Sequence, residues 1–148
     1  MKKWFIILGS LLLGWSAYFI YLNLPYEFKY EEGELREEVT SPSGRYTAQY
    51  YDQTYGGAAG GVHLFVNVVS HSEDEAVRTV YFSDANAYFH IKWLNDEQLA
   101  IRHLGGGDQS IVLTVGQEIY DGTGKACRRY AITKQYTCYS KKYSKEEP

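Results

Sequence analysis

The pattern of the chain begins with one long apolar run. Residues 4–22 are nineteen consecutive uncharged, mostly apolar positions, and Lys2 and Lys3 come directly before them. A helix of about nineteen residues rises about 28 Å, which matches the hydrocarbon core of a bilayer. Pro25 and a glutamate-rich segment follow. The pattern therefore predicts a cytoplasmic tip over residues 1–3 and a single transmembrane helix over residues 4–24.

A cleaved secretory signal peptide has a similar layout, with its best cleavage point before Ala17. The apolar character continues to Leu22, so a retained signal-anchor is the favoured reading. Because the lysines precede the helix and mainly glutamates follow it, the positive-inside rule places the N-terminus in the cytoplasm and the rest of the chain outside the cell membrane. The small residues Ser10, Gly14 and Ala17 share one helix face, which predicts a weak contact with a second copy of the helix.

After this run the pattern changes to period two. In residues 88–93, Phe89, Ile91 and Trp93 alternate with the polar His90 and Lys92. Such alternation is typical of β-strands with one buried face. The predicted strands cover residues 45–52, 62–70, 77–83, 88–93, 98–103 and 110–115, and no helical stripe interrupts them.

The fold class is therefore all-β: an N-terminal transmembrane helix followed by one small antiparallel domain, a sandwich or a bent sheet, over residues 39–143. Residues 25–38 carry six glutamates against Lys29 and Arg36, and this composition predicts an acidic stalk. Residues 117–143 are less regular and predict an added hairpin, and residues 144–148 form a tail.

An ordered set of short motifs accompanies the strands: Ser-Pro-Ser-Gly-Arg-Tyr at residues 41–46, Gly-Gly-Ala at 56–58, and Ile-Lys-Trp-Leu-Asn-Asp at 91–96. Over residues 39–103 the chain resembles a family of uncharacterised small membrane proteins of Gram-positive bacilli. The resemblance implies an architecture and a location, and it implies no activity. The glycines at residues 105–107 and the cysteine-containing tail depart from that family's pattern.

Cys127 and Cys138 are the two cysteines of the chain. Outside the cytoplasm they are expected to form a disulfide, as opposed residues of a hairpin that turns at Ile132 and Thr133. Two free thiols are the alternative. Neither cysteine has a Cys-x-x-Cys partner, so redox catalysis and zinc binding are not expected of them.

Residues 125–148 carry a net charge of +5, from seven bases and two acids. This composition indicates either contact with anionic lipid or wall polymer, or attraction to the acidic remainder of the domain. Nucleic acid is not an expected partner because the whole chain has a net charge of −3.

The sequence carries no recognisable catalytic set, metal site or cofactor motif. The histidines do not converge, and the nucleophile motifs of hydrolases are absent. The residues that could support catalysis are carboxylates in predicted loops: Asp96, Glu97, Asp108 and Asp121. A pair such as Asp96 and Asp108 would act as acid and base on a glycan if the two carboxylates lay within about 5–10 Å of each other.

Tyrosine is unusually frequent, since the chain has fifteen, and some of these side chains are expected at the surface. Tyr46, Tyr50, Tyr51 and Tyr55 lie on or beside one predicted strand next to the glycine-rich loop, and exposed tyrosine suits sugars, peptides and protein partners. We therefore expect a membrane-anchored, extracytoplasmic β domain that binds an envelope protein or wall polymer without catalysis. The alternative is a hydrolase of cell-wall polymer or glycan that uses the loop carboxylates.

Overall fold

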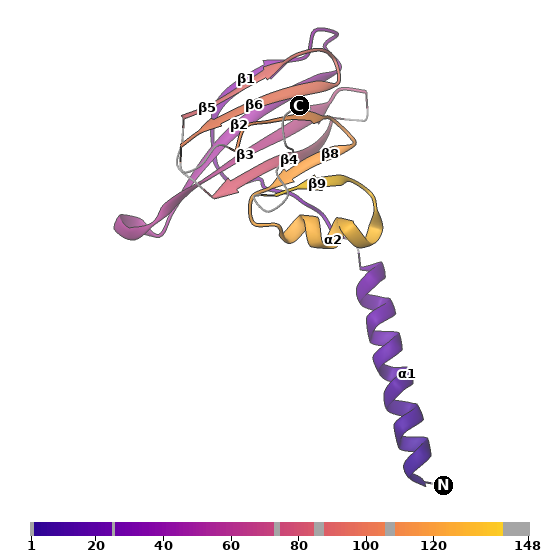
Figure 1. Ribbon diagram of the computed structural model, residues 1–148. Helices are drawn as coiled ribbons and strands as arrows, with labels where there is room; N and C mark the ends of the chain where they lie inside the picture. Colours follow the sequence, from indigo (N-terminus) through magenta and orange to yellow (C-terminus); the bar gives the residue numbers. More distant parts are fainter. Residues whose placement is uncertain (1, 25, 73–74, 85–87, 106–108, 141–148) are drawn as a thin grey trace.

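The computed structural model describes residues 2–24, 26–72, 75–84, 88–105 and 109–140. A long helix, α1 (Lys2–Asn23), extends away from one end of a β domain (Figure 1). The other elements follow in chain order as β1 (Glu34–Thr40), β2 (Tyr46–Tyr55), the 3-10 helix η1 (Gly57–Ala59), β3 (Gly61–Ser70), β4 (Ala76–Asp84), β5 (Tyr88–Trp93), β6 (Gln98–Leu104), β7 (Ile111–Thr114), β8 (Glu118–Asp121), α2 (Lys125–Thr133) and β9 (Thr137–Tyr139). The prediction of a mostly β protein is confirmed.

The strands form two sheets. The larger sheet has six strands in the order β1-β2-β3-β4-β8-β9, and the smaller has three in the order β5-β6-β7. Neighbours from β1 to β4 are antiparallel, whereas β4 with β8 and β8 with β9 are parallel. Parallel neighbours need a crossover connection; the smaller sheet connects β4 to β8, and α2 connects β8 to β9. The larger sheet is therefore mixed, and the prediction of a purely antiparallel domain is wrong at β8 and β9.

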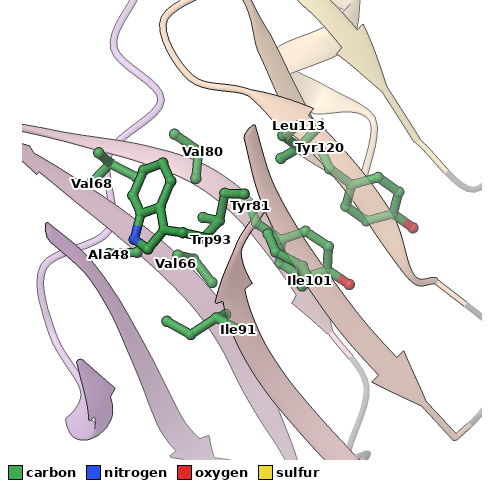
Figure 2. Close-up of a cluster of buried hydrophobic side chains, with 11 residues drawn as sticks. Ala48, Val66, Val68, Val80, Tyr81, Ile91, Trp93, Ile101, Leu113 and Tyr120 are labelled. Atoms are coloured by element: carbon green, nitrogen blue, oxygen red, sulfur yellow. The ribbon is translucent and has the colours of Figure 1, made fainter. Parts of the chain in front are cut away.

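The main hydrophobic core lies between the two sheets (Figure 2). The predicted inward positions of β5 are confirmed, because Ile91 and Trp93 are buried and Phe89 is partly buried against the same core. Leu99 and Ile101 of β6 are buried as well. The residues of the larger sheet that face them are Ala48, Val66, Val68, Val80, Tyr81 and Tyr120. The indole Nε1 of Trp93 donates a hydrogen bond to the carbonyl oxygen of Val39 at 2.8 Å, so even its polar atom is satisfied.

A second hydrophobic cluster covers the opposite face of the larger sheet. Phe65 and Phe82 point to that face, since successive side chains of a strand alternate between faces. Phe28, Ile119, Ala126 and Tyr130 pack against them. Strand β3 is thus buried on both faces, whereas the sequence predicted a strand over residues 62–70 with one buried face.

Residues 26–38 do not form a free stalk as predicted. Phe28 is 6% exposed, and the backbone N–H of Tyr30 donates to Thr79 Oγ1 at 2.9 Å. From Glu34 onward the segment pairs with β2 as strand β1. The physical reason is that Phe28 and Tyr30, two residues apart, place their rings on the back of the larger sheet and leave the intervening Lys29 exposed.

The hairpin predicted around Ile132 and Thr133 is also wrong, because both residues lie in the last turn of α2. Gly124, which has a φ of 69°, precedes the helix, and Lys134, which has a φ of 54°, follows it. Its buried side is formed by Ala126, Arg129 and Tyr130.

Helix α1 carries apolar side chains that are more than half exposed. They are Ile7, Leu11, Leu12, Leu13, Trp15, Tyr18, Phe19, Ile20 and Tyr21. Within the described part of the chain, no helix combines the length and apolar character that crossing a membrane requires. The transmembrane span over residues 4–24 is therefore not supported by that criterion and stays a prediction.

Candidate functional site

A pocket opens where β4 and β8 diverge. The two parallel strands are paired at Tyr81 with Tyr120 and at Phe82 with Asp121. Residues 76–79 of β4 are paired with β3 on one side, and no described strand is paired with the other side of residues 76–80. Unpaired backbone N–H and C=O groups on a strand edge remain available to a further strand.

The pocket has a volume of about 370 Å³, within the range that ligand-binding pockets have. Several segments line it: residues 26–29, residues 76–80 of β4, the turn between β7 and β8 with the start of β8, the chain at and after Tyr130, and single residues of β2 and β3 (Tyr46, Val68 and Ser70). None of these segments contributes a complete wall alone. The chain leaves β4, passes through the smaller sheet and returns as β8. Because β8 pairs only with the later part of β4, the pocket forms beside the first residues of that strand.

Aromatic rings form a large share of the pocket wall. Tyr26, Tyr46, Tyr130 and Tyr136 line it, and the rings of Tyr26 and Tyr130 meet edge to face at 5.4 Å. Burial raises the pKa of both Tyr26 and Tyr130. The Tyr130 hydroxyl accepts the N–H of Phe28 at 3.3 Å and donates to the carbonyl oxygen of Tyr26 at 3.5 Å. Rigid rings with a polar atom suit a ligand that has both apolar and polar groups.

The charged residues of the pocket are of both signs. Glu27 and Glu118 line it together with Lys29 and Arg78. The carboxylate of Glu118 is already engaged, since it accepts the N–H of Thr114 and the hydroxyl of Tyr139, each at 2.8 Å. The pocket therefore has no strong preference for an anion or a cation.

The four tyrosines predicted as binding residues are not brought together. Tyr46 and Tyr50 face the smaller sheet, where Tyr46 stacks on Trp93 at 6.0 Å and Tyr50 stacks on Phe89 at 4.3 Å. Tyr51 faces the other side and stacks on Phe65 at 5.2 Å. Of the four, only Tyr46 lines the pocket.

Tyr55 lies apart from the other three, beside the projecting turn of the β2–β3 hairpin (Figure 1). Its ring stacks on His63 at 4.3 Å, and its hydroxyl donates to Asp84 Oδ1 at 2.6 Å. This hydrogen bond, more than any other cause, raises the pKa of Tyr55. Gly60 closes the turn behind it, since a Cβ at that position would lie 1.5 Å from the carbonyl oxygen of Tyr55.

Two of the loop carboxylates proposed for catalysis, Asp96 and Asp121, have structural partners. Asp96 Oδ1 accepts the N–H of Ser43 at 2.6 Å, and this hydrogen bonding lowers the pKa of Asp96. Asp121 is 1% exposed and is used at the start of α2. Glu97 is exposed in the turn before β6. Asp108 lies outside the described residues, so the Asp96–Asp108 pair stays a prediction.

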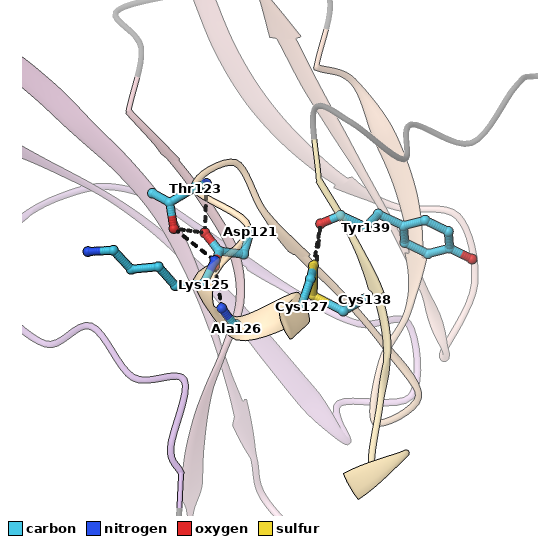
Figure 3. Close-up of a disulfide and its surroundings, with 7 residues drawn as sticks. All are labelled: Asp121, Thr123, Lys125, Ala126, Cys127, Cys138 and Tyr139. Carbon is cyan, nitrogen blue, oxygen red and sulfur yellow. Dashed lines mark hydrogen bonds between the residues drawn. A yellow bond between two sulfur atoms is a disulfide. The ribbon is translucent and has the colours of Figure 1, made fainter. Parts of the chain in front are cut away.

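Asp121 organises the turn that leads into α2 (Figure 3). Its Oδ2 accepts the backbone N–H of Ala126 at 2.7 Å, and its Oδ1 accepts the N–H and the hydroxyl of Thr123 at 2.9 and 2.7 Å. A carboxylate that accepts the N–H groups of a first helical turn satisfies donors that have no partner within the helix. Its role here is to begin the helix, and its oxygens are occupied.

Cys127 and Cys138 form a disulfide, as predicted (Figure 3). The bond connects α2 to β9, with a Cα–Cα distance of 4.9 Å. The pairing is confirmed, although its setting is a helix and a strand instead of a hairpin. It fixes the segment that carries Tyr130 and Tyr136, and so it fixes one wall of the pocket.

The four histidines do not meet. His63 packs by the β2–β3 hairpin, His90 pairs with Glu37 at 2.9 Å, His71 bonds Thr47 at 2.9 Å, and His103 is buried beside Tyr81. Among the residues that the structure describes, no three His, Cys, Asp or Glu side chains are grouped as metal ligands.

The sequence pattern missed most of the pocket. Residues 77–80 were predicted as part of an ordinary strand, and residues 26–29 as part of an acidic stalk. The alternating Tyr26, Phe28 and Tyr30 were the available signal that this segment packs on the domain, whereas the divergence of β4 from β8 has no local sequence signal.

The model of a family of unknown function, DUF5412, matches residues 1–125. The match begins at the first residue and ends inside α2, so it covers α1 and strands β1 to β8. No curated protein and no solved structure matches this chain. The expected resemblance to an uncharacterised family is confirmed over a longer range than residues 39–103, while the membrane location and the bacterial group that it implied stay predictions. The chain belongs to DUF5412, a family of unknown function.

Proposed function

We propose that this chain is a membrane-tethered binding protein whose β domain takes an extended peptide of a partner protein along the edge of β4, without catalysis. The observation that carries the proposal is the pocket of about 370 Å³ beside residues 76–80 of that strand. The sequence suggests a binding role at the cell envelope, and the proposal adds the class of ligand, a peptide, and the site, the edge of β4.

An edge of β4 that has no described strand beside it favours a peptide over other ligand classes. An extended peptide adds to an open strand edge through backbone hydrogen bonds, and pockets for alternate side chains give it selectivity. Residues 76–80 span about 16 Å, enough for a segment of about five extended residues. The rings of Tyr26 and Tyr136 offer contacts for its side chains, and the mixed charges nearby suit a chain of either sign.

The tether is proposed from α1. Its exposed apolar side chains lie on several sides of the helix, and a helix that is apolar all round is expected inside a large core or a membrane. Twenty-two residues rise about 33 Å, comparable with the hydrocarbon thickness of a bilayer.

The Cys127–Cys138 disulfide supports a location of the domain outside the cytoplasm, because disulfides persist in oxidising compartments. Alkaline phosphatase fused after Pro148 should then be active in cells. Activity of a cytosolic reporter at the same position would reverse the orientation and remove the envelope role.

The binding proposal is tested with linear peptides displayed on phage and selected on the full chain in nanodiscs. Val77→Arg places a long charged side chain at the pocket, where Val77 is 40% exposed. Val112→Arg is the matched control, since Val112 is 38% exposed on β7 and does not line the pocket.

A selected peptide should bind the wild type and Val112→Arg alike and should lose affinity at least about tenfold for Val77→Arg, the change expected when about 1.4 kcal/mol of contact is removed. An analogue methylated on its backbone nitrogens should also fail to bind, because it has no N–H to donate. Equal binding of the methylated analogue, or equal loss in both variants, would refute addition to the β4 edge.

A further inference from the structure

Helix α2 lies across the end of α1 that faces the β domain (Figure 1). The contact is specific. Arg129 is 8% exposed, and its Nη2 donates hydrogen bonds to the carbonyl oxygens of Tyr21 and Leu24, at 2.5 and 2.7 Å. Its guanidinium carbon also lies 4.4 Å from the centre of the Tyr21 ring.

These hydrogen bonds reach the carbonyl groups at the C-terminal end of α1. The last carbonyls of a helix have no partner within it and carry partial negative charge, so a cation there is stabilising. Arg129 therefore caps α1 from a different helix and fixes α2 beside the point where the chain leaves α1.

The exposed residues of α2 include the bases Lys125 and Arg128 and the apolar Ile132, which is 49% exposed. Lys134, the residue that follows the helix, is exposed too. Positions 125, 128 and 132 follow the spacing of one helix face, whereas Ala126, Arg129 and Tyr130 are buried on the other. Tyr21 and Leu24, each 54% exposed, extend the apolar contribution at the end of α1.

We propose that this exposed side of α2 rests on the headgroups of an anionic bilayer, the same bilayer that holds α1. The inference rests on the tether of the proposed function. Its physical basis is charge complementarity between three exposed bases and lipid phosphates, at the place where α1 brings the domain to the bilayer surface. Ile132 is the residue positioned to enter the boundary between headgroups and acyl chains.

A bilayer is favoured over a soluble anionic polymer by position. A polymer would be met equally well by bases anywhere on the domain, whereas Lys125 and Arg128 belong to α2, the helix whose Arg129 bonds the end of the apolar helix. The contact also orients the β domain. Because α2 is held on the bilayer surface and its Arg129 bonds the end of α1, the domain stands at one defined angle to the bilayer.

The test uses the full chain reconstituted in vesicles of phosphatidylcholine alone and in vesicles that also contain phosphatidylglycerol. Hydrogen exchange of residues 125–134 is measured in both, and an alkaline carbonate wash reports whether the chain stays in the bilayer. Exchange in α2 should be slower with the anionic lipid, by about fivefold for each base held at the surface.

The triple variant Lys125→Gln, Arg128→Gln and Lys134→Gln should lose this difference between lipids. The control is the triple variant Arg45→Gln, Lys92→Gln and Arg102→Gln, which removes the same charge from exposed positions of β2, β5 and β6 or their turns and should keep the difference.

The outcomes separate the inference from the tether. A chain that resists carbonate in both vesicle types but shows equal exchange in α2 would keep the tether and overturn the contact of α2. A chain extracted by carbonate, yet still protected in α2 by anionic vesicles alone, would overturn the tether and support the contact. Protection of α2 by soluble polyphosphate, equal to that given by the anionic vesicles, would overturn the choice of a bilayer.

Discussion

Trp93→Ala should destabilise the β domain strongly. Trp93 is 6% exposed at the end of β5, its ring stacks on Tyr46, and its Nε1 bonds the carbonyl oxygen of Val39 on β1. Truncating a buried tryptophan typically costs about 3–5 kcal/mol, and the carbonyl left without its donor adds about 1 kcal/mol. A small domain has about 5–15 kcal/mol of stability in total, so the loss is a large fraction of it.

The measurement is the unfolding free energy of the full chain in detergent, from urea titrations followed by circular dichroism. Tyr88→Ala is the matched control, because Tyr88 is an aromatic residue on the same strand with 66% of its surface exposed, and the expected change is within about 0.5 kcal/mol. His90→Ala should also change little, since its pair with Glu37 is exposed. If Trp93→Ala unfolds at the same urea concentration as the wild type, the packing of the two sheets around this ring is wrong.

Three further predictions concern turns and the cross-link. Replacing both Cys127 and Cys138 by serine should lower the unfolding free energy by about 2–3 kcal/mol, from the closure of a loop with a sequence separation of 11, and the same urea titration measures it. Asp121→Ala removes the acceptor of three hydrogen bonds and should cost about 2 kcal/mol or more, with faster hydrogen exchange in α2; unchanged exchange there would contradict its capping role. The lowered pKa of Asp96 means that its bond to Ser43 contributes stability above the ordinary aspartate pKa and loses it as the pH falls through the lowered value; Asp96→Asn should therefore melt below the wild type at neutral pH and with it in strong acid.

Local patterning was sufficient for the strands in the middle of the chain. The alternation around Ile91 and Trp93 gave the correct buried face, because in a half-buried strand the side chains of one face must be apolar. The same rule fails for β3, where Phe65 and Asn67 are buried too, since a second layer covers that face. One strand's sequence does not report what covers its far side.

The C-terminal part was mispredicted for two different reasons. Helix α2 has nine residues and is polar on average. Its short buried side therefore does not stand out in the sequence as a periodic row of apolar residues. Strands β8 and β9 have four and three residues, and their parallel partners lie far away in the sequence or across a helix. The candidate site depends on these elements, which is why residue patterns pointed to Tyr50, Tyr51 and Tyr55 instead of the edge of β4.

The most direct test of a peptide-binding edge is the hydrogen exchange of individual strands when a selected peptide is added to the full chain in nanodiscs. Addition of a strand beside β4 predicts slower exchange for residues 76–80, and little change for residues 111–114 of β7, which lie at the edge of the smaller sheet. The Val77→Arg variant should show no slowing under the same conditions. Protection that falls on residues 111–114 instead, or on neither strand, would contradict the account.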